Sequence, residues 1–253
     1  MKVTGITHKP FIPLFEDAVW CAFRALERQD LPNPTGIQTI RHEMSRFGHL
    51  SILSSALALE AAANCALAKL GKRGKTTKDI DKLSVLGKFD VYLLSRGGGD
   101  ILDRGHKFVQ PMDELINVRN AIVHPKIVNK TAAQLNGLTF ERETPKSKLL
   151  KIPSDRMLLR WTGDMAKEVL LRLCDFLNYF FLGLCKHSFE EVPGVLVDQA
   201  MFDGVLRQSS YQPTDFIWTA MNEWKLDTRF LHIIKCRTTI RDGKEIIEYP
   251  TYP

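Results

Sequence analysis

The sequence predicts a mainly α-helical protein: an up-and-down bundle of four to five helices with a small β-hairpin insertion and a C-terminal α+β appendage. Two observations lead to this fold class. Apolar residues recur at helical spacing through most of the chain before His187, and after it short β-rich runs and turn residues replace that pattern. We therefore expect a helical bundle over residues 1–187 and an extension with a β-hairpin over residues 188–253.

A strong break separates the first two predicted helices. Residues 14–28 have helical spacing, and the following LPNPTG ends the pattern with two prolines and a glycine. A longer helical signal runs from Ile37 to about Leu70. Its second half, SSALALEAAANCALA, is crowded with Ser and Ala, whose small side chains let another helix approach closely. We therefore expect this long helix to pack tightly inside the bundle.

Three further helices are predicted. The third covers about residues 77–94, with Thr77 as the N-cap. The fourth runs over about residues 109–123 and stops where Pro125 pushes His124 out of helical geometry. The last long helix covers about residues 158–186. With the first two, these helices make up the predicted bundle.

Two β-hairpins are expected. The segment GLTFERETPKSKLLKI, between the fourth and fifth helices, has two short extended runs around Thr144 and Pro145. Near the C-terminus, Asp242 and Gly243 lie between two β-rich runs in FLHIIKCRTTIRDGKEIIEY. The first hairpin is the insertion into the bundle, and the second belongs to the appendage.

Composition narrows the class of protein. The formal charge of +6 and the pI of about 9.0 permit a polyanionic partner such as nucleic acid without requiring one. The five cysteines are scattered and form no CxxC pair, which argues against a zinc knuckle and against a disulfide framework. No apolar run reaches about 18 residues without charges. We expect a cytoplasmic protein with no membrane span.

Several catalytic motifs are absent or incomplete. Gly74, Lys75 and Thr76 spell the end of a phosphate-binding loop, but Lys69 stands where that motif needs its first glycine, and the segment follows a helix rather than a strand. There is no HExxH pair and no GxSxG elbow. We therefore expect no metal, no cofactor and no serine or cysteine nucleophile.

The segment ELINVRNAIVHPK brings Arg119, Asn120 and His124 together at the end of the fourth helix. The ordinary interpretation is a solvated arginine and a histidine that caps the carbonyl end of the helix. The functional interpretation is a site where Arg119 binds an anion and His124 transfers a proton, because the end of a helix can turn both side chains to one side.

The surrounding segment, DRGHKFVQPMDELINVRNAIVHPK, resembles the HEPN superfamily of all-helical proteins. The hallmark of that family is an arginine, a polar residue, and a histidine four to six positions beyond the arginine. The long upstream helix, with Glu60 and Asn64 in ALEAAANCAL, is similar to the second helix of the family. The resemblance covers about residues 14–187. The first hairpin and the chain after His187 lie outside it.

The resemblance implies a metal-independent ribonuclease that acts as a homodimer, in a toxin–antitoxin or phage-defence setting. Cleaving RNA without a metal requires a base for the ribose 2′-OH, an acid for the leaving 5′-oxygen and a cation for the phosphate. Arg119 would hold the scissile phosphate, His124 would exchange protons and Asn120 would orient one of them. Each chain supplies one such histidine, so two copies facing each other would supply both. The product would carry a 2′,3′-cyclic phosphate.

Further residues are expected to support this site. Glu60, on the long helix, could pair with Arg119 and so support the catalytic site. The alternative is that Glu60 has no role in catalysis and is a plain interhelical salt bridge or an exposed acid. Four residues that flank the motif are expected to track RNA phosphates: Arg104, His106, Lys107 and Lys126. The expected partners are RNA, a second copy of the chain and, in a toxin–antitoxin setting, a neutralising antitoxin protein.

Two other functions compete with the ribonuclease. In the first, the chain is a non-catalytic dimeric HEPN adaptor, in which the same residues form an inherited anion pocket or a hydrogen-bond network. In the second, it is a DNA- or RNA-binding regulator that uses its basic surface. Binding by such a regulator would depend strongly on salt and would survive Arg119→Ala.

Overall fold

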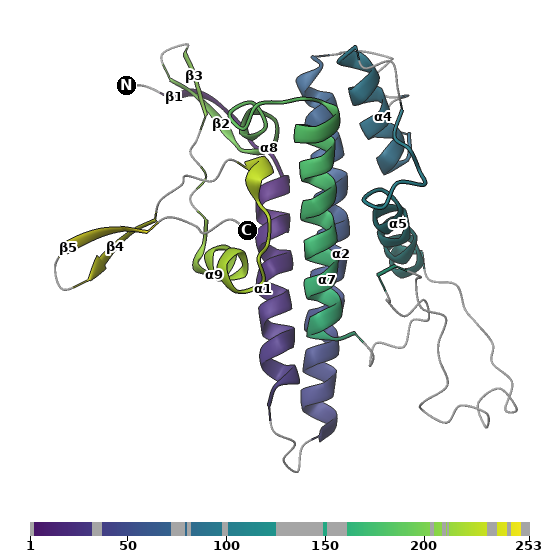
Figure 1. The fold of residues 1–253 in the computed structure, drawn as a ribbon, viewed down its shortest axis with the longest axis vertical. Helices are drawn as coiled ribbons and strands as arrows, with labels where there is room; N and C mark the ends of the chain where they lie inside the picture. The colour runs from purple at the N-terminus through teal and green to yellow at the C-terminus, as the bar shows by residue number, and fades with distance from the viewer. Residues whose placement is uncertain are drawn as a thin grey trace, which may run out of the picture.

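The computed structural model describes residues 3–31, 37–71, 79, 82–97, 101–124, 149–150, 161–202, 205–208, 211, 213–231, 237–241 and 244–248. The protein is mainly α-helical, which confirms the predicted fold class. Three long helices lie side by side, with two shorter helices beside them (Figure 1). The long helices are α1 (Phe11–Gln29), α2 (Ile37–Lys69) and α7 (Gly163–Leu177), and the shorter ones are α4 (Val85–Ser95) and α5 (Gln110–Val123).

The bundle core forms where α1, α2 and α7 meet. The Ala-rich half of α2 is buried, as its small residues predict, and includes Ala58, Ala62 and Ala66, all fully buried. A side-chain carbon added to Gly163, the first residue of α7, would lie 2.6 Å from the backbone nitrogen of Leu26 in α1. Small residues therefore let the three long helices approach closely at these points.

One helical stretch among the described residues, Ile40–Lys69 in α2, is long and apolar enough to cross a membrane. However, 61% of its most apolar window is buried inside the protein. Such burial is typical of the central helix of a bundle.

The third predicted helix needs correction. The single helix expected over residues 77–94 is wrong, because residues 82–84 are not helical and α4 begins at Val85. The physical reason is the cap: the Ser84 hydroxyl accepts a hydrogen bond from the backbone N–H of Gly87 at 3.1 Å, which satisfies one of the orphan donors of the first turn. The expected cap, Thr77, lies outside the described residues.

The last long helix, α7, begins at a side-chain cap and continues into a different kind of helix. Thr162 caps it, with its hydroxyl accepting from the backbone N–H of Met165 at 3.2 Å. After Leu177 the helix widens into a π-helix, η1 (Asn178–Leu184). The helical signal predicted to continue to Lys186 therefore comes from two kinds of helix.

The protein also contains strands, one at the N-terminus and the others in the C-terminal part. β1 (Val3–Thr7), β2 (Gln199–Phe202) and β3 (Val205–Gln208) form an antiparallel sheet in that order, with Thr7 opposite Gln199. The predicted C-terminal hairpin is confirmed as an antiparallel pair in which Arg241 lies opposite Lys244. The remaining elements are α8 (Pro193–Leu196), α9 (Asp215–Glu223), η2 (Arg229–Leu231), β4 (Arg237–Arg241) and β5 (Lys244–Glu248). The hairpin expected around Thr144 and Pro145 lies outside the described residues.

The appendage shares its core with the bundle. Phe230 of η2 packs edge-on against Phe11 and Phe15 of α1, with ring centroids 6.0 and 6.3 Å apart. Trp224 stacks on Phe23 of α1 at 4.1 Å. Aromatic packing therefore joins the two parts of the chain in the structure. The division into two domains, residues 1–187 and 188–253, stays a prediction.

Candidate functional site

The last two turns of α5 carry the predicted motif. The helix buries Met112, Leu115 and Val118, and this apolar stripe sets its rotation against its neighbours. Arg119 follows the last buried residue of the stripe, so its side chain starts at the edge of the buried face. The Arg119 side chain is accordingly only 17% exposed.

Arg119 has two polar partners in the structure. Its Nη2 atom forms an ion pair with Oε2 of Glu60 on α2, and its Nη1 atom donates a hydrogen bond to Oδ1 of Asn120 at 2.9 Å. The Glu60 side chain is 30% exposed, so water only partly screens the pair. The two partners hold the guanidinium at the junction of α2 and α5. An ion pair between Glu60 and Arg119 is thus present, and it agrees both with the expected support of Arg119 and with the alternative of a plain interhelical salt bridge. The functional roles of both residues stay predictions.

His124 ends the helix. Its φ of −113° and ψ of 68° take the chain out of helical geometry, and its backbone N–H donates to the carbonyl oxygen of Asn120 at 3.0 Å. This agrees with the helix end predicted from the proline that follows. The residue is exposed, one and a half turns beyond Arg119, so its imidazole lies at the surface at the end of α5.

A second polar contact lies one turn farther along α2. Lys88 of α4 is buried, and its Nζ atom donates to Oδ1 of Asn64 at 2.8 Å. The sequence analysis did not single out Lys88, although a signal was present: it is spaced three residues from Val85 and four from Tyr92, both buried. A lysine on an apolar helix face needs an acceptor, and Asn64 supplies it. The face of α2 that carries Glu60 therefore receives cations from two different helices.

Three of the other expected RNA-contacting residues, Arg104, His106 and Lys107, lie before the start of α5, at the opposite end from the motif. Arg104 forms an ion pair with Asp90 of α4, whose other oxygen accepts from the backbone N–H of Leu102 at 2.8 Å. Because α5 rises about 1.5 Å per residue, roughly 13 Å of helix separates Gln110 at its start from Arg119. The structure therefore does not bring Arg104 together with the motif.

His106 and Lys107 each have an aromatic partner. The His106 ring stacks on Tyr179 of η1, with centroids 4.1 Å apart and planes 5° from parallel. Lys107 places its ammonium 4.8 Å from the ring centre of Phe108. Stacking fixes the His106 ring against the π-helix, and no local sequence signal could have revealed Tyr179 as its partner. Lys126 lies outside the described residues.

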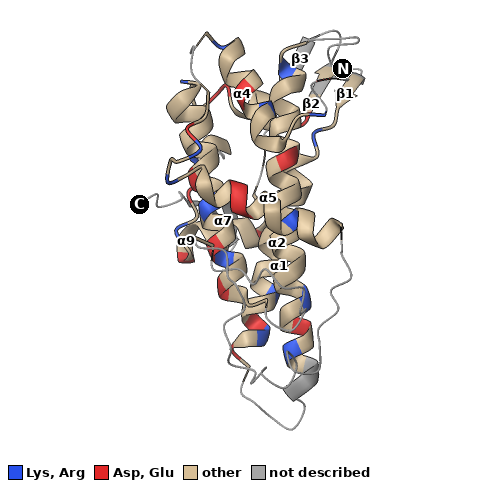
Figure 2. Ribbon diagram, turned by 90° about the vertical axis from the view of Figure 1, so that its right-hand side faces the viewer, with Lys and Arg blue, Asp and Glu red and all other residues tan. Residues whose placement is uncertain are grey.

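Basic and acidic residues are interspersed along the long helices (Figure 2). Arg28 of α1 pairs with Glu43 of α2, and Arg172 of α7 pairs with Glu168 on its own helix. Local pairing therefore leaves these arginines less able to attract the polyanionic partner that the net charge permits.

Thiol and metal chemistry receive little support in the described part of the chain. No group of three or more His, Cys, Asp or Glu residues there is arranged to hold a metal ion. Four cysteines are described, and all are buried as free thiols: Cys21, Cys65, Cys174 and Cys185. Burial raises the pKa of Cys21 to about 11 and that of Cys185 to about 12, which disfavours the reactive thiolate.

Comparison of the chain with family models, with curated protein sequences and with solved structures gave no match.

Proposed function

We propose that the protein is a metal-independent RNA endonuclease of the HEPN type, in which Arg119 binds the scissile phosphate and His124 transfers protons. The observation that carries this proposal is the arrangement of Arg119, which Glu60 and Asn120 orient near the end of α5, the helix that the exposed His124 terminates. Preorganised cations and donors of this kind stabilise the charge that develops on phosphate in a transition state.

Arg119 retains the capacity to bind a phosphate. A guanidinium has five N–H donors, and Glu60 and Asn120 each receive one. The remaining donors could take phosphate oxygens in the paired geometry that arginine favours. Glu60 would then position Arg119 rather than touch the substrate.

The proposed reaction needs two proton transfers. In the first, a neutral imidazole takes the proton from the ribose 2′-OH while the 2′-oxygen attacks the adjacent phosphorus. In the second, a protonated imidazole gives a proton to the leaving 5′-oxygen. The products are a 2′,3′-cyclic phosphate and a 5′-hydroxyl. One chain supplies a single His124, so we propose that a homodimer brings the second. Asn120 orients one of the protons.

The proposed substrate is single-stranded RNA or tRNA, and the proposed setting is a cytoplasmic toxin–antitoxin or phage-defence system, in which an antitoxin protein would neutralise the nuclease. Unstacked RNA fits the chemistry because its 2′-OH can rotate into line with the phosphate that is attacked. Arg104, His106 and Lys107 would contact the RNA beyond the cleavage point, from the far end of α5.

A second candidate is a non-catalytic dimeric adaptor. The ion pair between Glu60 and Arg119 favours it, because a pair that joins α2 to α5 would be kept for stability even if no substrate were bound. In this function, the residues at the end of α5 form a structural network and RNA is left intact.

Incubating the purified protein with total RNA and with tRNA, in the presence of EDTA, distinguishes these functions. We expect cleavage products with 2′,3′-cyclic phosphate ends. His124→Ala should lower the cleavage rate by about 100-fold or more, the usual contribution of a general acid or base. Arg119→Ala should have an effect of similar size.

The matched control is His42→Ala, because His42 is an exposed histidine in the N-terminal part of α2, away from the motif. It should cut RNA at the wild-type rate. Intact RNA with the wild-type protein would rule out the nuclease and leave the adaptor, whereas equal cleavage by the His124→Ala and wild-type proteins would rule out His124 as the catalytic residue.

A further inference from the structure

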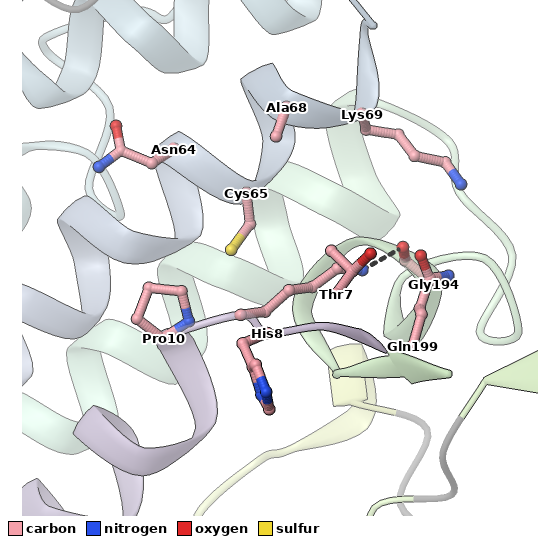
Figure 3. A pocket seen from close by; sticks show the side chains of 10 residues that line it. Thr7, His8, Pro10, Asn64, Cys65, Ala68, Lys69, Gly194 and Gln199 are labelled. Carbon is pink, nitrogen blue, oxygen red and sulfur yellow. Dashed lines mark hydrogen bonds between the residues drawn. The ribbon is translucent and has the colours of Figure 1, made fainter. Parts of the chain in front are cut away.

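A cavity of about 360 Å³ lies where the C-terminal end of α2 passes over the junction of β1 and α1 and meets α8. Its size is within the range of small-molecule sites, about 300–1,000 Å³. Figure 3 shows Cys65 pointing from α2 toward the segment that carries His8 and Pro10, with Gly194 and Gln199 on the other side. Four separate segments of the chain therefore build the walls.

The walls of the cavity are basic and apolar. Lys9 and Lys69 belong to the lining, whereas none of the described residues that line the cavity is an aspartate or a glutamate. Pro10, Cys65 and Ala68 add apolar surface. The two lysines disfavour a metal cation, and the composition favours a ligand that carries both a negative charge and a short apolar part.

Lys9 is the best placed cation. Its Nζ atom donates to the carbonyl oxygen of Gly194 at 2.7 Å, and this neutral acceptor uses one of the three ammonium donors. Burial lowers the pKa of Lys9, which reflects the cost of keeping a charge in a partly dry cavity. A bound anion would offset that cost with a charge-assisted hydrogen bond.

The carboxylate of Asp198 lies beside the cavity, in contact with Lys9 and His8. One of its oxygens accepts from the backbone N–H of Lys9 at 2.5 Å, and the other lies 3.1 Å from Nδ1 of His8. Asp198 therefore holds the backbone at the entrance while offsetting the charge of one lysine. Among the described residues, two lysines and one aspartate leave a single positive charge in excess, which matches a monoanion better than a phosphate dianion.

We propose that this cavity binds a small monoanionic carboxylate with a short apolar tail, the carboxylate on Lys9 and the tail against Pro10, Cys65 and Ala68. The site is separate from the proposed nuclease centre, since its α2 residues lie beyond Glu60 toward the end of the helix. It does not depend on whether the protein cleaves RNA.

An NMR titration of the full-length, 15N-labelled protein tests the proposal. Hexanoate should give saturable shifts at the amides of Thr7, Lys9, Ala68 and Gly194. Hexanamide, which has the same tail without the charge, should bind about tenfold more weakly or worse, the usual effect of losing a charged hydrogen bond. Inorganic phosphate should produce no saturable shift at these amides.

Lys9→Met keeps most of the side-chain volume and should weaken hexanoate binding about tenfold, while Lys82→Met, at an exposed lysine before α4, should not change it. If Lys9→Met fails to fold, the comparison of hexanoate with hexanamide in the wild-type protein still decides. Equal binding of the two compounds, no saturation by hexanoate, saturation by phosphate alone, or unchanged binding in folded Lys9→Met would each overturn the proposal.

Discussion

The ion pair between Arg119 and Glu60 is the most informative contact of single side chains in this protein. The two residues are 59 positions apart in sequence and meet because α5 packs on α2. Their side chains are 17% and 30% exposed. This burial is intermediate between that of exposed ion pairs, which add almost nothing to stability, and that of fully buried pairs, whose disruption is costly.

A double-mutant cycle with Glu60→Gln and Arg119→Met should therefore give a coupling energy of about 1–2 kcal/mol in urea unfolding. The matched control is the pair of Arg28 and Glu43, which also joins two helices but has side chains 42% and 44% exposed. Its coupling should stay below about 0.5 kcal/mol. Equal coupling for both pairs would mean that shielding of the Arg119 pair adds nothing.

His187 lies in a second polar cluster, which the proposed function does not use. Its Nε2 atom lies 2.9 Å from the Tyr92 hydroxyl, and its Nδ1 atom lies 3.4 Å from a carboxylate oxygen of Glu191. Burial, followed by the nearby Arg96, lowers the pKa of His187 below its ordinary value of 6.5, and Glu191 offsets this only in part. The folded protein therefore prefers the neutral imidazole.

Stability should fall in acid because of this histidine. The unfolded chain binds the proton more readily, so the contribution of His187 is present above about pH 6.5 and is lost as the pH falls through its folded-state pKa. Urea midpoints measured at pH 7.5 and 5.5 should differ less in His187→Gln than in the wild type. The exposed His42 provides the control, since His42→Gln should keep the wild-type difference. An undiminished difference in His187→Gln would contradict the assignment.

Among the helices, the change from α7 to the π-helix η1 joins the bundle to the appendage. Asn178, the first residue of η1, is buried, and its amide makes two hydrogen bonds of 2.8 Å. It donates to the carbonyl oxygen of Asp227 and accepts from the backbone N–H of Phe230. Single-turn π-helices often occur at functional positions, and here the π-helix carries a structural clamp.

Asn178→Ala should lower the free energy of unfolding by about 2–3 kcal/mol, because it leaves a buried backbone donor and acceptor without their partner. Asn117→Ala on α5 is the control, as Asn117 is exposed and its contact with Asp113 is a long 3.4 Å. That change should stay within about 0.5 kcal/mol. Both values can be measured by chemical unfolding, and a similar loss in the two variants would argue against the clamp.

Helix prediction succeeded where the signal was local. The helices expected over 14–28, 37–70 and 109–123 are present within three residues at either end. It failed over 77–94, where the cap at Ser84 overrides the helical spacing that precedes it. The strand β1 was not expected, because five residues without clear alternation become a strand only when β2, almost 200 residues later, pairs with them.

For the protein as a whole, the proposed function requires more than one chain. A single copy places one His124 at the end of α5, and the proposed reaction uses an acid and a base at the same time. The active particle should therefore be a dimer whose two α5 ends face a common cleft.

Sedimentation equilibrium should give a mass of about twice the 28.8 kDa of one chain. The rate of RNA cleavage per chain should fall on dilution as the dimer separates, because each half would then lack one of the two imidazoles. A monomer that cleaves RNA at full rate would refute the shared site.

The fold class, the order of the helices and the end of α5 before Pro125 could be inferred from the amino-acid sequence, because spacing, caps and breakers act within a few residues. So could the candidate motif of Arg119, Asn120 and His124. The contacts of Lys88 with Asn64 and of His106 with Tyr179, and the cavity at Lys9, became visible only in the folded chain. Their partners lie far apart in sequence and meet because several elements pack at once, which no local pattern encodes.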